Sequence, residues 1–544
     1  MIRRPFSRAF WIAMSAATLA MVGCAHKTGV AIDAGRSTAT TATSENGSIK
    51  GLAKGGAEIF LGLPFAAPPM GSLRWSPPER AASWQGVRDG TVAGSSCPQH
   101  SGSPVIGRTE NEDCLFLNLY RPAGTASGAS LPVLVYVHGG ANTVGGAVQI
   151  AGARMAAENG VVVVAINHRL GSLGFLNHPA LAQQAKDRLA GNYALLDIKA
   201  ALEWVQRNIG AFGGNPKKVT LGGTSSGGTN VCPLLVNPGT AGLIHAAIIS
   251  SDDCLRDVDS VAQSEARAAA FAAKLGCANP ENVVTCLRSK SAGELVTAGG
   301  AWNPHVDPKG FHRKPAIDAI AAGEWRAVPV LMGSTREEGR GSGTAFANFT
   351  AQAYAAWVTR LVGAERAPAL LAAYPADKYS GQFALSYVVG DFITDSGMRG
   401  LGGCTNLALA RHLARQTPTY YYQFEDPIPP APSTPPGYEF RASHGLDTPF
   451  TWPDSPHMAQ ASSRFNEAQR QLSKEMTRYW AAFAKNFNPQ VPGQAAWPRL
   501  IADGSLMSLR PGGQSQATPV AQFAELHKCA LWEKMPWVLD RGER

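Results

Sequence analysis

The sequence predicts an α/β protein: a mainly parallel central sheet flanked by helices, with helical insertions forming a cap. Two continuous apolar runs, 132–137 and 161–166, have the length and composition of strands that are buried on both faces. An amphipathic segment over 192–208 predicts a helix, and a β-branched run at 219–221 predicts the next strand. Strands that alternate with helices in this way form parallel sheets with right-handed crossovers.

The other elements are predicted in chain order from turns and apolar periodicity. Residues 49–121 are rich in Pro and Gly turns and predict short strands and loops. Helical regions over 258–295 and 351–415, the second broken at Pro368 and Pro375, are expected to form the cap. Further predicted elements are strands at 246–250, 328–332 and 420–424 and a long helix over 459–487.

Residues 1–24 predict a secretory signal. Arginines within the first eight residues precede an alanine-rich apolar run over 9–22. The run ends in Met-Val-Gly-Cys, which is similar to a bacterial lipobox and makes Cys24 the candidate lipidated residue; ordinary cleavage after Ala25 is the alternative. We therefore expect an exported protein, either in the bacterial periplasm, as an outer-membrane lipoprotein, or secreted.

A flexible linker is expected over residues 25–37, followed by one folded domain over 38–544. The Thr-, Ser-, Gly- and Ala-rich composition behind this expectation continues to about Ser48, which extends the expected tether to that residue.

The charge of the chain is positive but dispersed. The formal net charge is +9 over 544 residues, and no dense run of Lys and Arg occurs. This is typical of a mildly basic surface and gives no nucleic-acid footprint. We therefore expect no nucleic-acid partner, and contact with a membrane only through a lipid anchor on Cys24.

The cysteines predict disulfides in an oxidising compartment. There are nine, and setting Cys24 aside leaves an even number. Short spacing favours Cys97–Cys114 and Cys277–Cys286, and Cys404–Cys529 would then tie the C-terminal region back. The spacing does not decide whether the remaining two, Cys232 and Cys254, form a disulfide.

The segment around Ser225 is the candidate nucleophile. It reads Gly-Thr-Ser-Ser-Gly over 223–227, after the strand at 219–221 and before a predicted helix. Such a strand–turn–helix holds a serine oxygen exposed at the carboxyl edge of a parallel sheet.

A serine hydroxyl needs a base, and the base needs an acid that orients it. The strand at 328–332 is followed by Glu337 and Glu338, and the last predicted strand is followed, beyond a proline-rich loop, by His444. The chain order Ser, Glu, His is that of α/β-hydrolases. Either glutamate could be the acid on these grounds.

Backbone N–H groups are needed to bind the oxyanion of an acyl transfer. The N–H of Ser226, directly after the nucleophile, is one candidate, and the small residues after His138 supply Gly140 and Ala141 as others. No His, Cys and Asp cluster has zinc spacing and no phosphate-binding loop occurs in the sequence, so we expect neither a metal nor a cofactor.

Several segments from about Ile49 to the C-terminus resemble the type-B carboxylesterases, the cholinesterase-like family of α/β-hydrolases. The motifs that carry the resemblance are Phe-Leu-Gly-Leu-Pro-Phe-Ala over 60–66, Asn-Glu-Asp-Cys-Leu-Phe-Leu-Asn over 111–118, and the stretch from Gly191-Asn192 to Phe-Gly-Gly-Asn-Pro over 212–216.

The resemblance implies a role for each candidate residue. Ser225 is implied as the nucleophile, Glu338 rather than Glu337 as the acid, and His444 as the base. Oxyanion donors are implied at Gly140, Ala141 and Ser226, and disulfides at Cys97–Cys114, Cys277–Cys286 and Cys404–Cys529.

This chain departs from the family pattern beside the nucleophile. Thr224 stands where the family usually has glutamate, Ser226 replaces alanine, and Ala141 replaces a third glycine. The missing negative charge makes cationic choline esters less favoured substrates.

The predicted function is hydrolysis of a small carboxylic ester through an acyl-enzyme. The alternatives are a non-catalytic adhesion or binding member of the family, and a lipase, polyester or toxin-ester hydrolase with the same mechanism. Trp302 and Phe346 are guesses for residues that line the pocket. Oligomeric state and acyl-chain preference are left open.

Overall fold

A sheet of thirteen strands forms the centre of the computed structural model. The structure describes residues 38–100, 107–252, 254, 259–432, 435–456, 458–502 and 504–535. The predicted signal, Cys24 and the linker over 25–37 lie outside this range. In spatial order the strands are β1 Thr38–Ser44, β2 Gly47–Lys54, β3 Ala57–Pro64, β5 Phe116–Pro122, β7 Val162–Ile166, β6 Leu131–Val137, β8 Gly214–Thr224, β9 Ala246–Ser250, β12 Val330–Thr335, β13 Thr419–Phe424, β14 Ser505–Leu509 and β15 Gln516–Pro519, with β4 Val87–Asp89 beside β2.

The middle of this sheet is parallel, as predicted. From β7 through β6, β8, β9, β12 and β13 to β14, every neighbouring pair is parallel. The strands toward both edges pair antiparallel, except β4, which runs parallel to β2, so the whole sheet is mixed.

The first strand lies inside the Thr-, Ser- and Ala-rich stretch that was expected to be flexible. β1 pairs antiparallel with β2, from Thr38 opposite Ala53 to Ser44 opposite Gly47. The expectation of a tether reaching Ser48 is therefore wrong for residues 38–48. Threonine-rich segments suit strands, and here alternate side chains, including Ala42, turn inward.

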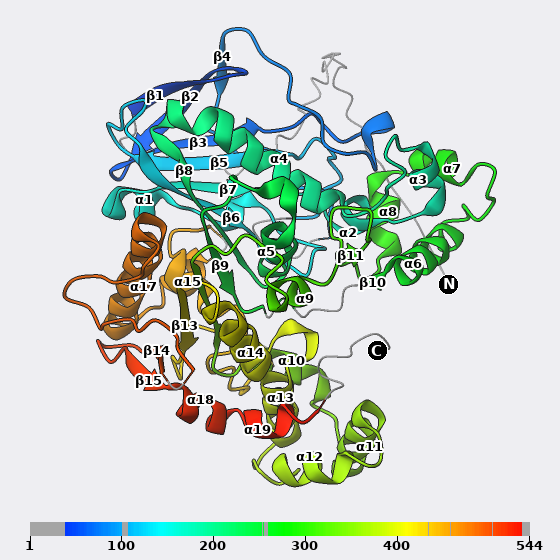
Figure 1. Ribbon diagram of the computed structural model, residues 1–544, viewed down its shortest axis with the longest axis vertical. Coiled ribbons are helices and arrows are strands. Elements are labelled where there is room, and N and C mark those ends of the chain that lie inside the picture. Colours follow the sequence, from blue (N-terminus) through cyan, green and yellow to red (C-terminus); the bar gives the residue numbers. More distant parts are fainter. Residues whose placement is uncertain are drawn as a thin grey trace, which may run out of the picture.

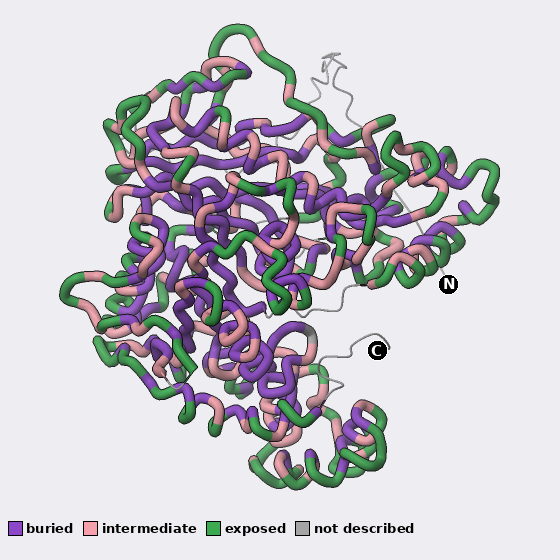
Figure 2. Tube along the Cα trace, viewed as in Figure 1, coloured by how far each residue is buried: buried purple, intermediate pink, exposed green. Residues whose placement is uncertain are grey.

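Helices cover both faces of the sheet (Figure 1). One face packs against α4 Tyr193–Asn208, α5 Ser226–Val236 and α14 Gly403–Ala414. The other packs against α1 Ala153–Asn159 and α17 Glu467–Asn486. Buried residues run through the strands, while the outer surfaces of the helices are exposed (Figure 2).

The predicted helix over 459–487 is two helices. A short one, α16 Ala459–Ser462, ends before Phe465, and α17 begins after Asn466. Asn466 and Gln469 form a capping box, in which each side chain accepts a hydrogen bond from the other residue's backbone N–H.

Two groups of helices lie outside the sheet layers, the first on the right of Figure 1 and the second toward the bottom. The first contains α6 Val261–Lys274, α7 Val283–Ser289 and α8 Ala292–Ala298, and the second α11 Ala351–Val362, α12 Ala367–Ala373 and α13 Ala384–Ser396. Each has its own apolar core. The predicted helical region over 351–415 is only partly cap, because α14 packs on the sheet.

The aromatic residues guessed as pocket lining belong to these cap cores. Trp302 is buried with its ring edge-on to Phe271, and Phe346 packs against Phe349 and Trp357.

Four disulfides join the described cysteines. Cys97–Cys114, Cys277–Cys286 and Cys404–Cys529 confirm the expected pairs. The two cysteines that the sequence left open, Cys232 and Cys254, form the fourth.

Candidate active site

Ser225 lies at the turn between β8 and α5, in a strained backbone conformation. Its φ is 57° and its ψ is −129°. The turn is tight: a Cβ on Gly223 would lie 2.4 Å from the Gly227 carbonyl carbon, and a Cβ on Gly227 would lie 2.3 Å from the Val137 carbonyl oxygen. Only glycine leaves room for strand and helix to pass this closely, so the local sequence fixes the position of the serine.

The structure brings Ser225, His444 and Glu338 together from three distant loops. His444 Nε2 lies 2.9 Å from Ser225 Oγ, and His444 Nδ1 lies 2.6 Å from Glu338 Oε2. The second oxygen of Glu338 accepts a 2.7 Å hydrogen bond from the Thr335 N–H. The imidazole is thus held between a carboxylate and a hydroxyl, the arrangement that a proton relay requires.

Glu338, and not its neighbour, is the glutamate that contacts the histidine. Glu337 instead accepts a 3.2 Å hydrogen bond from the Ala442 N–H, and Arg336 and Arg441 lie nearby. Sequence spacing alone did not decide which of the two glutamates contacts the histidine. The structure places Glu338 at the imidazole, as the family resemblance implied.

Glu338 is fully buried, yet it favours the carboxylate form. Burial alone raises the pKa of a carboxyl group, but His444 and the hydrogen bond from Thr335 hold the pKa of Glu338 below its ordinary value. A buried carboxylate beside the imidazole stabilises the imidazolium that forms when the histidine accepts a proton.

The loop over 138–146 places its backbone close to the nucleophile. Gly140, Ala141 and Asn142 all have positive φ, and a Cβ on Gly140 would lie 2.0 Å from the Val144 carbonyl oxygen. A Cβ on Gly139 would come within 3.2 Å of the Ser225 Cβ. Within the described ranges, the N–H groups of Gly140, Ala141 and Ser226 have no backbone or side-chain acceptor. The geometry suits oxyanion donors, and their role stays a prediction.

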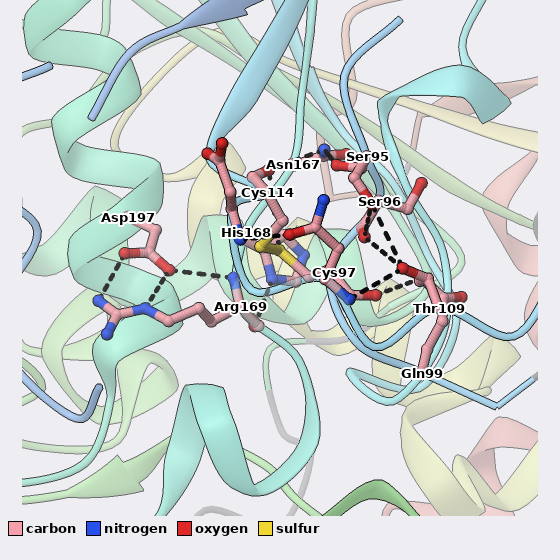
Figure 3. The surroundings of a disulfide bond; sticks show 12 residues. Ser95, Ser96, Cys97, Gln99, Thr109, Cys114, Asn167, His168, Arg169 and Asp197 are labelled. Carbon is pink, nitrogen blue, oxygen red and sulfur yellow. Dashed lines mark hydrogen bonds and ion pairs between the residues drawn. A yellow bond between two sulfur atoms is a disulfide. The ribbon is translucent and has the colours of Figure 1, made fainter. Parts of the chain in front are cut away.

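A second set of side chains supports this loop, and the sequence analysis missed it. Gln99 donates from Nε2 to the Gly145 carbonyl at 2.7 Å and accepts the Gly145 N–H at 2.8 Å. Asn167 accepts the Ala147 N–H at 2.7 Å and donates to the Ser95 and Cys114 carbonyls. Figure 3 shows both side chains beside the Cys97–Cys114 disulfide. Neither belongs to a motif that a single sequence could reveal.

Two histidine rings stack at the start of this loop. The His138 and His168 rings are parallel, with centroids 4.6 Å apart, and His138 Nδ1 lies 2.8 Å from the Gly139 carbonyl oxygen. Burial lowers the pKa of His138 to about 3 and that of His168 to about 4. Both rings are therefore neutral near neutral pH, and His138 braces the loop as an Nδ1–H donor.

A further carboxyl group, Asp447, lies near the three residues. It is buried and accepts a 3.3 Å hydrogen bond from the Tyr422 hydroxyl. Burial, together with the negative Glu338, raises the pKa of Asp447 to about 6. Thr224, which replaces the usual glutamate, pairs with the Tyr136 hydroxyl at 2.7 Å and adds no charge.

One cluster of metal-ligand types occurs in the described part of the chain. Cys232, Asp252 and Cys254 have ligand atoms within 4.8 Å of one another. Because the two sulfurs are bonded to each other, only Asp252 has an ordinary ligand atom left.

Comparisons with known proteins agree on one family. The Carboxylesterase family model matches residues 37–532. A fumonisin B1 esterase of Sphingopyxis macrogoltabida is 33% identical over 86% of this chain and 85% of its own. An acylcarnitine hydrolase of Mus musculus is 32% identical over 84% of both chains.

Solved structures give the same picture. A PNB esterase superposes with a TM-score of 0.72 at 28% identity, covering 90% of this chain and 100% of that one. A thermophilic PNB esterase gives a TM-score of 0.73. The chain belongs to the type-B carboxylesterase family and is a carboxylic-ester hydrolase with the α/β-hydrolase fold.

Proposed function

We propose that the chain hydrolyses carboxylic esters through an acyl-enzyme formed on Ser225. The observation that carries the proposal is the chain of two contacts, 2.9 Å from Ser225 Oγ to His444 Nε2 and 2.6 Å from His444 Nδ1 to Glu338. His444 takes the hydroxyl proton as Ser225 attacks the ester carbonyl, and then donates it to the leaving alcohol. Water, activated by the same histidine, attacks the acyl-enzyme and releases the acid.

The backbone of two loops is proposed to stabilise the oxyanion. The N–H groups of Gly140, Ala141 and Ser226 are the donors. Removal of one such donor in other hydrolases costs about 3 kcal/mol, so the contribution to the rate is large. Glu338 keeps the imidazole oriented and stabilises its charged form.

Replacing the nucleophile tests the mechanism. Ser225→Ala is expected to lower kcat for a short-chain p-nitrophenyl ester by at least about a thousandfold, because no hydroxyl remains to form the acyl-enzyme. A fluorophosphonate should label the unmodified protein and fail to label this variant. Ser463→Ala, at an exposed serine, is the matched control and should keep full activity. Substantial turnover by Ser225→Ala would overturn the proposal.

Neutral esters are the proposed substrate class. Here Thr224 and Tyr136 place a neutral hydroxyl pair beside the nucleophile. We expect kcat/KM to be higher for an ethyl ester than for the choline ester of the same acid. Thr224→Glu should lower the ratio of the first value to the second. A preference for the choline ester would contradict this assignment.

We also propose that the protein is exported and carries a lipid on Cys24. Four disulfides support an oxidising compartment. No helix among the described residues is long and apolar enough to cross a bilayer. Metabolic labelling with an alkyne fatty acid should mark the unmodified protein in bacterial cells and not Cys24→Ala. Equal labelling of both would refute the lipid site, and an uncleaved cytoplasmic product would refute export.

A further inference from the structure

A cavity lies on the face of the sheet that α1 covers. Its volume is about 600 Å³. Its floor is formed by alternate residues of two neighbouring strands, Ile59 and Leu61 on β3 and Asn118 and Tyr120 on β5, and α1 packs against both strands. Ser225, Glu338 and His444 are absent from its described walls. The cavity is therefore separate from the candidate active site.

Small side chains on α1 leave this space open. Ala153 and Ala157 are one helical turn apart and both line the cavity, so these two positions of the helix contribute only methyl groups to its wall. Val148, in the short helix η2 Ala147–Gln149, adds another apolar wall. The lining is mainly apolar, and the volume is in the range of small-molecule sites.

Two buried polar groups line the cavity without a protein partner. Asn118 is 2% exposed; its Oδ1 accepts the Gly62 N–H at 3.1 Å, which leaves its NH₂ group for the cavity. Tyr120 is 5% exposed, and its hydroxyl, like the Asn118 NH₂, has no hydrogen-bond partner in the described ranges. Burial raises the pKa of Tyr120 above its ordinary value, so the phenol is neutral. Both groups reach the free space of the cavity, where each can donate a hydrogen bond to a ligand oxygen.

The charged residues that line the cavity are two positive and two negative side chains. Arg154 on α1 pairs with Asp454 at 2.8 Å. Lys54 and Glu158, the other two charged residues of the lining, are of opposite sign. The balanced rim gives no preference for an ionic ligand.

We propose that this cavity is a binding site for a neutral, elongated apolar molecule with one carbonyl or hydroxyl oxygen. The apolar chain would lie between the floor and α1, and the oxygen would accept a hydrogen bond from the Asn118 NH₂ group or the Tyr120 hydroxyl. The proposal concerns binding alone and does not depend on the role of Ser225.

Photolabelling tests the site on the intact protein. The probe is a medium-chain methyl ketone with a diazirine on its alkyl chain, which offers a carbonyl oxygen and cannot be hydrolysed. Labelled peptides are identified by mass spectrometry, so label near Ser225 and label in this cavity are counted separately. We expect crosslinks in peptides that contain residues 54–61, 118–120 or 153–158, and competition by a medium-chain alcohol.

Two variants make the outcome decisive. Ala157→Leu fills the cavity and should abolish these crosslinks, while Ala321→Leu, at an exposed helical alanine, should leave them unchanged. Tyr120→Phe keeps the shape and removes the hydroxyl, and should weaken probe binding by about tenfold. Ester hydrolysis should stay at its original rate in all three.

Absence of crosslinks in these peptides, or crosslinks that persist in Ala157→Leu, would overturn the site and leave a cavity that holds water only. Retained hydrolysis in Ser225→Ala would overturn the proposed function and would not change the labelling pattern. The two failures are therefore distinguishable.

Discussion

At the scale of single residues, the candidate site depends on how closely backbone segments approach one another. Gly227 lies where α5 crosses the end of β6, and a Cβ there would meet the carbonyl oxygens of Val137 at 2.3 Å and His138 at 2.7 Å. The strained φ of Ser225 is kept by this contact and by the 2.9 Å hydrogen bond from the Ser225 N–H to the Ser250 carbonyl.

Gly227→Ala should therefore damage both stability and activity. The added methyl group forces the turn apart, and overpacking of this kind costs about 1–3 kcal/mol. We expect a lower thermal midpoint and at least about a tenfold loss of kcat, because the loop that carries the proposed oxyanion donors Gly140 and Ala141 begins at His138. Gly210→Ala is the matched control, since a Cβ at Gly210 meets nothing within 4 Å. Equal behaviour of the two variants would show that the crowding is unimportant.

Asp447 should make a measurable contribution to the pH dependence of stability. Its folded pKa is about 6, above the ordinary 3.8, so the folded state holds more protons than the unfolded state between these values. The stability that this proton provides is present below about pH 4 and is lost as the pH rises through about 6. Asp447→Asn removes the effect. Relative to the unmodified protein, it should gain up to about 3 kcal/mol of unfolding free energy between pH 4 and 7.

Urea unfolding at several pH values measures this difference. Asp377→Asn, at an exposed aspartate, is the control and should run parallel to the unmodified protein. A constant offset between Asp447→Asn and the unmodified protein across this pH range would contradict the prediction.

At the scale of elements, the loop over 138–146, which carries two of the proposed oxyanion donors, is held by hydrogen bonds to the segment around the Cys97–Cys114 disulfide. Gln99 satisfies both backbone groups of Gly145, and Asn167, directly after β7, connects this segment to η2. The loop is thus fixed by two side chains that do not themselves reach the nucleophile.

Gln99→Leu should lower kcat more than it raises KM. The substitution leaves the Gly145 N–H and carbonyl unpaired, so the loop is expected to relax and the oxyanion donors to lose alignment. We expect about a ten- to hundredfold loss of kcat on a p-nitrophenyl ester, with the fold retained by circular dichroism. Gln183→Leu, at an exposed glutamine, serves as control. A change confined to KM would point to a role in substrate binding instead.

The elements that could be predicted are those with strong local patterns. The apolar runs became β6 and β7, and the amphipathic segment became α4. β15 escaped prediction because it has four residues, three of them exposed, and forms the sheet edge. The helix predicted from residue 459 divides because the capping box of Asn466 and Gln469 starts α17 at Glu467, after the short α16 has ended.

For the site, the order of serine, glutamate and histidine was readable because each follows a strand. The choice of Glu338 over Glu337 needed the family resemblance, and the structure shows why: one residue turns toward His444 and the other toward Ala442. Gln99, Asn167 and Asp447 were not predictable, since each acts through contacts with residues far away in the sequence.

At the scale of the whole molecule, the candidate site is assembled at the carboxyl ends of the central strands. Ser225 follows β8 and Glu338 follows β12, and these strands are separated only by β9. His444 reaches the same edge from beyond β13, the neighbour of β12. The site is therefore a property of the complete parallel region and needs every strand of it in register.

The longest disulfide loop should matter most for overall stability. Cys404 and Cys529 are 125 residues apart, whereas Cys277 and Cys286 are 9 apart. Because closing a longer loop removes more entropy from the unfolded chain, replacing both members of the Cys404 pair by alanine should cost about 2 kcal/mol more than the same change at Cys277 and Cys286. Thermal unfolding of the two double variants measures the difference. Equal losses would show that native contacts, and not loop length, decide the effect.

The sequence separation of each disulfide also sets the delay between the synthesis of its two cysteines. A ribosome adds about 5–20 residues each second, so Cys286 follows Cys277 within about two seconds, while Cys529 appears about 6–25 seconds after Cys404. During that interval the Cys404 thiol lacks its native partner, Cys529. Cysteines earlier in the chain are then available to form non-native disulfides with it. We therefore expect non-native disulfides formed during synthesis to involve Cys404 more often than Cys277 or Cys286.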